Sequence, residues 1–388
     1  MPLAYKSRVI FAKTETTPGI YSAPAASDAV LCANLEVSPL EGSAVDRNVI
    51  RPYFGSFGSF RAESYVTLDF ETELAGSGAA GTAPQWDNLM RACMCSSTVF
   101  ASPTASTTVG GSTINAIKLA ATASAVDDFY VGLSLTIAGE TREITGYNGA
   151  TKTANVSRAF STAPAAAEAY SISAGVVYQL ASDISAATSL SFIFNLNGVQ
   201  HEVYGAKGTF SLDLTIKEIP TIKWKFTGLY RPVNDTVQMS GSFLSWQTPV
   251  PVSVYNTTDF DIMGWLTPIV SKFSLDVGNS VNYRQLIGSE SVAITERKPV
   301  GSVQFEAPKV AVKDVWALVK ADTASSFTVK HGTVAGNIVG ITAPVVQPGA
   351  PKYSEQDGIA MLELSLSFQP LISATNTGGN NEFRITAK

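Results

Sequence analysis

Polar and apolar residues alternate with a period of two through much of this 388-residue chain, and that pattern limits the folds open to it. Successive side chains of a strand point to opposite faces, so an alternating stretch forms a strand with one buried and one wet face. The sequence therefore predicts a mainly β protein with antiparallel sheets. The clearest stretches are YVTLDFETEL (65–74), TFSLDLTIKE (209–218), TIKWKFTGLY (221–230) and AMLELSLSFQ (360–369).

Two short segments have helical spacing instead. In PQWDNLMRACMC (84–95), Pro84 suits a first helical position, and apolar residues then recur every third or fourth residue. VKDVWALVKAD (312–322) shows the same spacing. We expect two short helices, each capping a sheet.

The composition excludes several classes of protein. The chain has 27 Lys and Arg against 32 Asp and Glu, a net charge of −5, and a pI near 5.2 that argues against a basic nucleic-acid interface. Charged residues make up only 15%, which suggests a surface partly buried against copies of the chain. We expect no membrane span and no signal peptide, because no apolar run is long enough. A chain without a signal peptide stays in the reducing cytosol, so Cys32, Cys93 and Cys95 should stay reduced.

A charge-poor stretch rich in Ala, Ser and Thr begins near residue 98 and leads into a segment with its own strand and turn signals. Asn148-Gly149 is a strong hairpin signal within it. We therefore expect residues 100–175 to form a small β-domain inserted into a larger domain made of residues 1–99 and 176–388. A weaker similarity links residues 194–230 and 273–306, which share a rhythm of strands and turns. One sheet motif used twice would explain it, although no strict period supports a solenoid.

Residues 39–60 look like a long loop with an unusual content of aromatic residues. Long loops without regular structure are usually functional or disordered, and aromatic residues with Arg are typical of interface cores. We favour a partner-docking loop over a loop folded back on its own domain. The residues concerned are Arg51, Tyr53, Phe54, Phe57 and Phe60.

The sequence offers no support for catalysis, a cofactor or a metal. Residues 76–81 match G-x-G-x-x-G, but the preceding strand carries three carboxylates and no acidic residue follows at the right distance, so we interpret the match as a turn. His201 and His331 are the only histidines, and Cys93 and Cys95 are too close together for structural zinc. We expect a protein that is not an enzyme.

Three carboxylates, Asp69, Glu71 and Glu73, lie on one face of a single predicted strand, about 7 Å apart. Each adjacent pair repels by about 0.6 kcal/mol in water and by several-fold more in a poorly screened interior, so this face meets bulk water, a water-filled channel or a row of cations. Glu36 and Glu363 also occupy polar faces of their strands. A solvated outer face is the simplest interpretation of these residues alone.

The order of several segments along the chain resembles that of tail tube proteins (major tail proteins) of long-tailed bacteriophages. The similarity covers most of residues 9–98 and 176–388, and each segment is a loose pattern. The segments are KTETTPGIYSAPAASDAVLCANLEVSPLEG, PQWDNLMRAC, GAKGTFSLDL, IPTIKWKFTGLYRP, VGNSVNYRQLIGS, ITERKPVGSVQFEAP, HGTVAGNIVGITAPVVQP, YSEQDGIAMLELSLSFQP and NNEFRITAK.

The resemblance implies a β-sandwich whose copies join edge to edge into hexameric rings, which stack into a tube that carries the phage genome. Residues 29–37 and the strands at 65–74, 209–218 and 360–369 would then line the lumen, with Glu36, Asp69, Glu71, Glu73 and Glu363 facing DNA that passes without specific binding. Other tail proteins (terminator, distal tail and tape measure proteins) would be partners. The protein would be a virion component, assembled in the host cytoplasm.

Several expectations remain open at this stage. Lys223 and Lys225 could pair with the acids, lie outside the lumen or contradict an acidic lumen. Residues 39–60, 13–28 and 374–388 would join stacked rings, and residues 100–175 would fold alone and project outward. The main rival function is a host-surface or carbohydrate-binding component, in which the inserted domain stacks sugars on aromatic rings, although core packing would explain these rings too. The rings concerned are Tyr130, Tyr147 and Tyr170.

Overall fold

The computed structural model describes residues 3–47, 49–55, 57–183, 188–266, 268–372 and 379–388. The prediction of a mainly β chain with two short α-helices is confirmed. The helices are α1 (Asp87–Ala92) and α2 (Val315–Lys320), and a 3-10 turn, η1, spans Ala26–Asp28. Helix α1 begins three residues after Pro84 and buries Leu89 and Met90.

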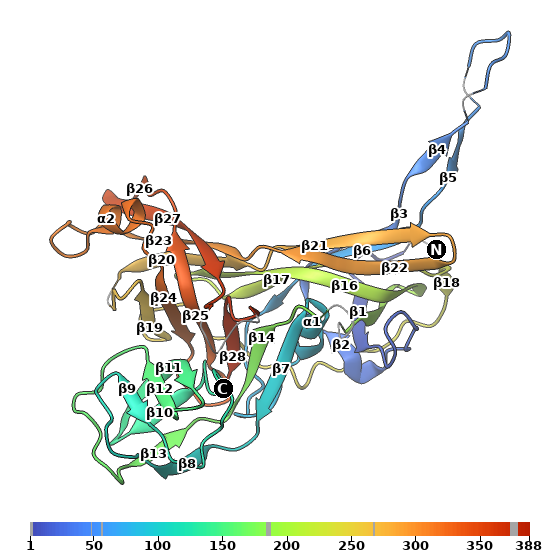
Figure 1. The fold of residues 1–388 in the computed structure, drawn as a ribbon. Coiled ribbons are helices and arrows are strands. Elements are labelled where there is room, and N and C mark those ends of the chain that lie inside the picture. Colours follow the sequence, from blue (N-terminus) through green and yellow to red (C-terminus); the bar gives the residue numbers. More distant parts are fainter. Residues whose placement is uncertain (1–2, 48, 56, 184–187, 267, 373–378) are drawn as a thin grey trace.

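Eight strands form one continuous antiparallel layer, which runs across the width of the molecule in Figure 1. Period-two alternation places one face of this layer in the core: buried Leu68 and Phe70 alternate with half-buried Asp69 and Glu71. In their order across the layer, the strands are β3 (Ala33–Glu41), β6 (Tyr65–Glu73), β17 (Thr221–Tyr230), β16 (Val199–Thr215), β20 (Val270–Asp276), β23 (Val300–Glu306), β27 (Ile359–Gln369) and β26 (Lys352–Gln356).

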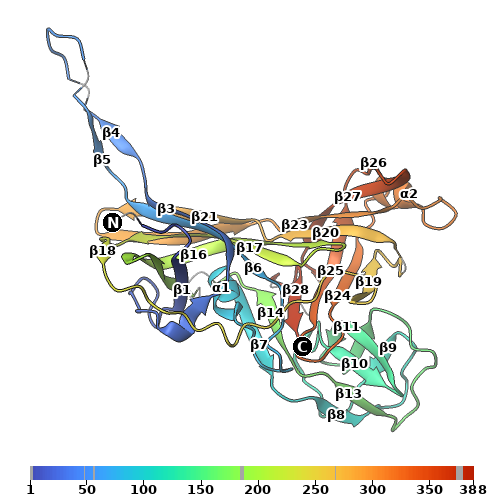
Figure 2. The same cartoon turned by 180° about the vertical axis from the view of Figure 1, so that it is seen from behind.

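A second antiparallel layer packs beneath the first, and large apolar side chains such as Trp224, Phe226, Phe192 and Phe327 fill the space between. Figures 1 and 2 show this layer below the long sheet. Its paired strands are β7 (Cys95–Phe100), β14 (Gly175–Leu180), β28 (Arg384–Ala387), β25 (Val339–Pro348), β24 (Ser325–His331) and β19 (Thr257–Ile262).

Four further strands extend the two layers at their margins. The end of β25 also pairs with β27, so the second layer reaches the edge of the first. The marginal strands attach through β16 and are β1 (Arg8–Thr14), β2 (Ala29–Val30), β15 (Leu190–Leu196) and β18 (Asn234–Asp235).

Two β-hairpins extend from the first layer, and we call them the first arm (residues 42–64) and the second arm (residues 277–299). The first arm contains β4 (Ala44–Asp46) and β5 (Ser59–Arg61), and the second contains β21 (Asn279–Leu286) and β22 (Ser289–Arg297). The expectation of an irregular loop at residues 39–60 is therefore wrong for residues 39–41, 44–46 and 59–60, which lie in strands. Residues 39–41 continue β3, and most of the rest belongs to a hairpin whose strands are only three residues long.

The segment expected to be an inserted domain forms a separate sheet with a core of its own, seen below the second layer in Figure 1. Val177 of β14 also belongs to that core. The hairpin signal at Asn148-Gly149 lies at a turn that follows β11. In sheet order the strands are β8 (Thr104–Thr107), β13 (Ala169–Ile172), β10 (Ser134–Ile137), β11 (Glu140–Asn148), β12 (Thr153–Val156) and β9 (Ala116–Lys118).

Candidate functional site

The polar face of the first layer gathers the acidic residues singled out from the sequence. Strand register places Glu36 of β3 opposite Asp69 of β6, with Glu71 and Glu73 two and four residues farther along the same face. At the other side of the layer, Glu363 of β27 lies opposite Gln304 of β23. Register through the intervening strands puts all five carboxylates on the same face of one sheet.

Lysines interrupt this acidic row, which corrects the simple picture of an acidic wall. Lys225 lies opposite Asp69, with its Nζ 3.9 Å from the Asp69 carboxylate. Lys223 lies 2.8 Å from the carboxylate of Asp213 on β16, an acid that the sequence alone did not single out. Lys225 thus pairs with one of the three acids, which is one of the possibilities left open, whereas Lys223 pairs with a different acid on the same face. Pairing across strands could not be found without the register, because β6 and β17 are separated by about 150 residues.

Local charges shift the titration of this face. Partial burial raises the pKa of the Asp69 carboxyl, nearby Glu36 and Glu41 raise it further, and Lys225 opposes them. The hydrogen bond and charge of Asp213 raise the pKa of Lys223. The face is therefore a mixed-charge surface whose carboxylates still interact with one another.

The second arm covers one end of the polar face. Its Tyr283 ring stacks on Tyr65 at the start of β6, with ring centroids 4.9 Å apart. At this end of the layer Thr67 and Thr227 of the polar face are each only 9% exposed, and the Thr67 hydroxyl donates to the Glu41 carboxylate at 2.7 Å. At the base of the arm, the Asn279 side-chain amide donates to the carbonyls of Cys93 (2.9 Å) and Gly208 (3.1 Å). These contacts hold the second arm on the body of the protein.

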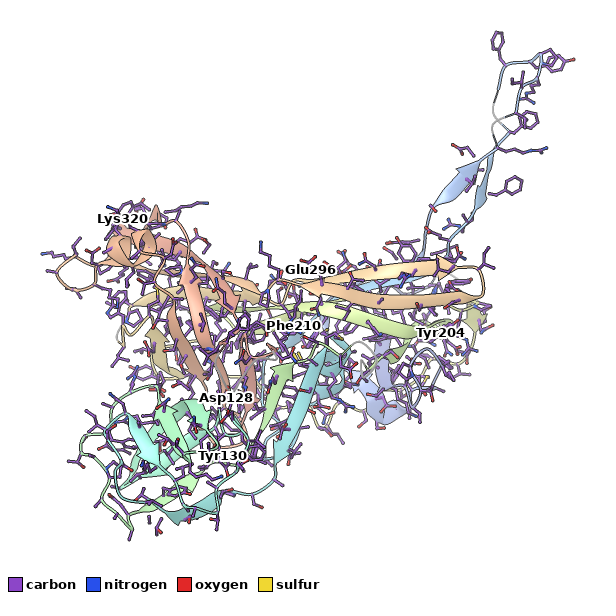
Figure 3. All side chains as sticks on the ribbon, viewed as in Figure 1. Asp128, Tyr130, Tyr204, Phe210, Glu296 and Lys320 are labelled. Atoms are coloured by element: carbon purple, nitrogen blue, oxygen red, sulfur yellow. The ribbon has the colours of Figure 1, made fainter. Side chains whose placement is uncertain are left out.

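The first arm makes no comparable contact among the described residues. Both views show it projecting away from the body, and Figure 3 shows its side chains standing free of any other element. Tyr53 is 76% exposed, and Phe54 is fully exposed. Phe60 is exposed on β5 near the base. Arg51 lies over the ring of Phe57, with its guanidinium carbon 4.1 Å from the ring centroid, which covers part of that aromatic surface.

The two other segments expected to join rings are at least partly buried. Glu15, just after β1, is buried and accepts hydrogen bonds from the hydroxyls of Ser189 and Ser191. Strand β28 lies between β14 and β25 with all its residues buried. The expectation of a docking surface is therefore wrong for residues 384–387, because they form part of the sandwich core; residues 374–378 lie outside the described residues.

The inserted sheet is tied to the body through buried charges. The Lys388 ammonium and the Glu143 carboxylate form a buried ion pair, and Lys388 also donates to the Gly132 carbonyl at 2.9 Å. Arg384 donates to the carbonyl of Asp128, which Figure 3 labels beside the inserted sheet. Burial lowers the pKa of Lys388, and Glu143 opposes that effect. These contacts join the insert to the body; that residues 100–175 fold alone stays a prediction.

The aromatic rings considered for sugar stacking lie inside the insert. Tyr130, Tyr147 and Tyr170 are all buried. The Tyr147 hydroxyl donates to the Ser124 carbonyl, and the hydroxyls of the other two tyrosines accept backbone N–H groups. They are core residues, and none of them presents a face to a ligand.

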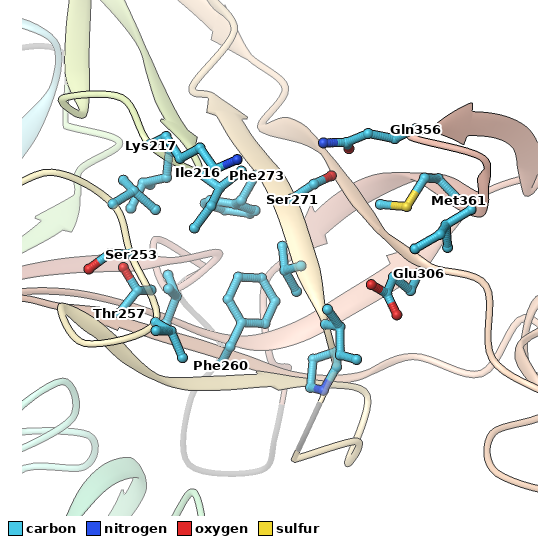
Figure 4. Close-up of a pocket in the computed structure, with 18 of the residues that line it drawn as sticks. Ile216, Lys217, Ser253, Thr257, Phe260, Ser271, Phe273, Glu306, Gln356 and Met361 are labelled. Atoms are coloured by element: carbon cyan, nitrogen blue, oxygen red, sulfur yellow. The ribbon is translucent and has the colours of Figure 1, made fainter.

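A mostly apolar hollow of about 440 Å³ lies between the ends of β16, β20 and β24 (Figure 4). Its polar side chains include Lys217 and Glu306. Within the described ranges no cluster of His, Cys, Asp and Glu could hold a metal ion, and Cys32, Cys93 and Cys95 are free thiols. Nor does any helix of the described residues have the length and apolar character to cross a membrane.

The glycine motif at residues 76–81 is a packed turn. The Gly76 N–H donates to the Asn337 side chain at 2.8 Å, and the Gly78 N–H donates to the Gly336 carbonyl at 2.9 Å. A Cβ on Gly76 would lie 2.1 Å from the Gly336 carbonyl oxygen, so this position requires glycine for a close backbone approach. The motif thus serves loop packing within the protein.

The sequence is similar to a known protein family over most of its length. The family model described as phage tail tube protein matches residues 6–370, nearly the whole chain. No curated protein matches the chain. That family is a structural one, whose members build multi-subunit tubes in the virion tail together with other tail proteins. The chain therefore belongs to the family of phage tail tube proteins.

Proposed function

We propose that copies of this chain join edge to edge into closed rings, each containing six tube folds, and that the stacked rings enclose a channel for genome delivery. The observation that carries this proposal is the first layer itself, a continuous antiparallel sheet with one polar face. In the part of the chain that the structure describes, the outermost strands, β3 and β26, each have one edge without a partner strand. Within the described residues β3 pairs only with β6, and β26 only with β27.

Open strand edges are hazardous on a monomer because their unpaired N–H and C=O groups attract other strands. All five residues of β26 are exposed, and most of β3 is exposed too. A head-to-tail interface whose rotation closes satisfies both edges at once and leaves no free end. Closure therefore gives these two strands a role that a monomer does not.

The polar face suits a channel for DNA. Packaged DNA carries one negative charge per roughly 1.7 Å of axis, so an uncompensated basic wall would hold it. Here Lys223 and Lys225 are paired with Asp213 and Asp69, while Glu36, Glu71 and Glu73 add further negative charge. Such a wall offers little net attraction, and DNA can slide past without specific binding.

Contacts between stacked rings are assigned in this proposal to the tip of the first arm. Ile50 and Phe54 are fully exposed there, and apolar surface of that kind is typical of a protein interface. The inserted sheet lies on the side of the second layer away from the polar face, which suits an outward position on the tube (Figure 1). Terminator, distal tail and tape measure proteins would be the partners at the tube ends and in the channel, with assembly in the host cytoplasm.

Electron microscopy of the purified protein tests tube formation directly, and hollow tubes are the expected result. For the channel, we compare virions carrying Asp69→Lys, Glu71→Lys and Glu73→Lys together with virions carrying Asn and Gln at the same positions. The lysine variant should build tubes of normal length but deliver its genome poorly, and the neutral variant should deliver it better. Normal delivery by the lysine variant would contradict a lumen position for these residues.

A further inference from the structure

The first layer contains the same four-strand arrangement twice. The first unit has the order β3-β6-β17-β16, and the second unit has the order β20-β23-β27-β26. In both, the first two strands flank an arm, the last two form a hairpin, and the later strand of that hairpin pairs with the strand after the arm.

The spacing of the two units agrees closely at the arms. Glu41 and Tyr65, which bound the first arm, are 24 positions apart (65 − 41), and Asp276 and Val300, which bound the second, are also 24 apart (300 − 276). At the base of the first arm the Glu63 N–H donates to the Ser43 carbonyl. The Lys298 N–H donates to the Gly278 carbonyl at the base of the second arm, 235 positions later in both donor and acceptor.

The elements that follow the arms agree as well. Each unit continues after its second strand into a six-residue helix, α1 or α2. Each helix leads to an antiparallel pair in the second layer, β7–β14 or β24–β25. The inserted sheet lies between β7 and β14, so it interrupts the first unit alone. The chain thus contains this arrangement of strands, arm and helix twice in tandem, with β15 present, among the described residues, in the first unit alone.

The two units join within the chain through β16 and β20. Leu212 lies opposite Leu275 and Leu214 opposite Phe273 on the core side, so the core continues across the junction. Every neighbouring pair in the layer is antiparallel, so β20, four strands after β3, runs in the same direction as β3. The second unit therefore repeats the first by a head-to-tail step, the relation that generates a ring.

From this internal junction we infer that β26 of one chain pairs antiparallel with β3 of the next, as β16 pairs with β20, and that three chains complete the ring. The count rests on the proposed function, because it fills six tube folds with two from each chain. The hexameric ring that the resemblance implies would need six chains only if each chain had a single unit. The partner that fits the β26 edge is a second copy of this chain.

The arms support the same junction. The second arm lies on the first unit, on the side where β16 meets β20, and its Tyr283 reaches Tyr65. The first arm has no preceding unit in its own chain, so it would pack on the second unit of the neighbouring chain. Val300, the position there that corresponds to Tyr65, is 40% exposed. The tip of the second arm remains exposed at Leu286 and Ile287 although the arm packs on the first unit. The tip of the first arm would likewise stay exposed and could contact the next ring.

Symmetry of the assembled tube tests the chain count. Cryo-electron microscopy of wild-type tubes should show three inserted sheets around each ring, and native mass spectrometry of released rings should give the mass of three chains. Six inserts in a ring would overturn this inference while leaving the tube function intact. A protein that stays monomeric under all assembly conditions would overturn the proposed function itself.

A backbone variant tests the β26 edge. The hairpin between Gln356 and Ile359 has a two-residue loop, so the N–H of Glu355 points away from β27. Glu355→Pro removes that N–H, while the matched Glu355→Ala variant loses the same side chain and keeps the N–H. We expect a folded monomer without rings for Glu355→Pro and rings for Glu355→Ala. Rings of equal yield from both folded variants would contradict the edge pairing.

Cross-linking keeps the inference testable if the proline variant does not fold. The register of β16 and β20 places Gln356 of one chain opposite Ser38 of the next, because these positions correspond to Asp213 and Ser274. A chain carrying Cys32→Ser, Ser38→Cys and Gln356→Cys is assembled and treated with a short bis-maleimide. A denaturing gel should then show a ladder that ends at three chains. The control with Cys32→Ser and Ser38→Cys alone should show no ladder. A ladder that reaches six chains, or its absence in assembled rings, would overturn the proposed junction.

Discussion

The two arms differ in their surroundings, although each joins equivalent strands and has the same length. The second arm buries Val292 and Ile294, and it stacks Tyr283 on Tyr65. The first arm leaves Tyr53 and Phe54 in solvent. The unit that lies beside an arm thus decides whether that arm is covered, and only the second arm has such a unit in its own chain. An isolated chain is in this sense an incomplete ring.

Removing each arm should give the largest contrast. The Ala62 N–H donates to the Ser43 carbonyl at 2.9 Å, so an Asn-Gly turn can replace residues 44–61 and close the hairpin there. We expect this variant to melt like the wild type but to form neither rings nor tubes. Replacing residues 279–297 in the same way should lower the melting temperature of the monomer. Light scattering and thermal unfolding measure the two effects.

Normal tubes from the variant without the first arm would show that the bare arm is dispensable. A monomer whose stability is unchanged without the second arm would show that its seat contributes little. Either result would remove the contrast between the arms.

Single apolar side chains should show the same contrast in monomer stability. Ile294 is buried against Met94, and truncation to Ala should cost about 2–4 kcal/mol of unfolding free energy through lost burial and the cavity left behind. Phe54→Ala on the first arm should change it by less than about 0.5 kcal/mol, because Phe54 touches water. Urea denaturation of the monomers measures both values. Equal costs at the two sites would mean that the first arm is also seated in solution.

The sequence predicted the fold class because β6, β16, β17 and β27 alternate cleanly. It missed β26, whose five residues KYSEQ are nearly all polar and lie on an open edge, where no core enforces alternation. It described the first arm as a loop because its strands are three residues long. The rhythm shared by residues 194–230 and 273–306 indicated a repeated motif, but it joined the end of the first unit to the start of the second, and only the pairings reveal the true repeat.

The candidate site was predictable to a similar extent. Alternation along one strand was enough to group Asp69, Glu71 and Glu73 on one face. Their neighbours on that face depend on register between strands far apart in sequence, which is why Asp213 was missed as the partner of Lys223. The aromatic residues of the first arm were found because exposure of large apolar side chains is costly and therefore informative.

The anchor of the second arm should have a smaller effect than its apolar contacts. Asn279 donates to two backbone carbonyls, and Asn279→Ala leaves both without this donor, at a cost of about 1–3 kcal/mol. The corresponding position of the first arm is Ala44, which is exposed and has no such anchor. Asn282→Ala, an exposed position on the same strand, is the control and should cost less than about 0.5 kcal/mol. Equal losses of unfolding free energy for the two variants would show that the anchor is not important.

The smallest effect should distinguish the covered end of the polar face from its open part. Under the second arm Thr67 and Thr227 of this face are buried, whereas the side chains of Asp69 and Lys225 in the open part are exposed to solvent. Burial raises the pKa of Asp69 in the folded state, so the native protein binds more protons than the unfolded chain between the ordinary and the raised value. Stability should therefore fall as pH rises through that window, and Asp69→Asn should remove this part of the slope. Because Lys225 lowers the pKa of Asp69, Lys225→Met should raise it further and extend the fall to higher pH. Thermal unfolding of the three monomers at a series of pH values measures the slopes, and identical slopes would mean that water screens the open part of the face fully.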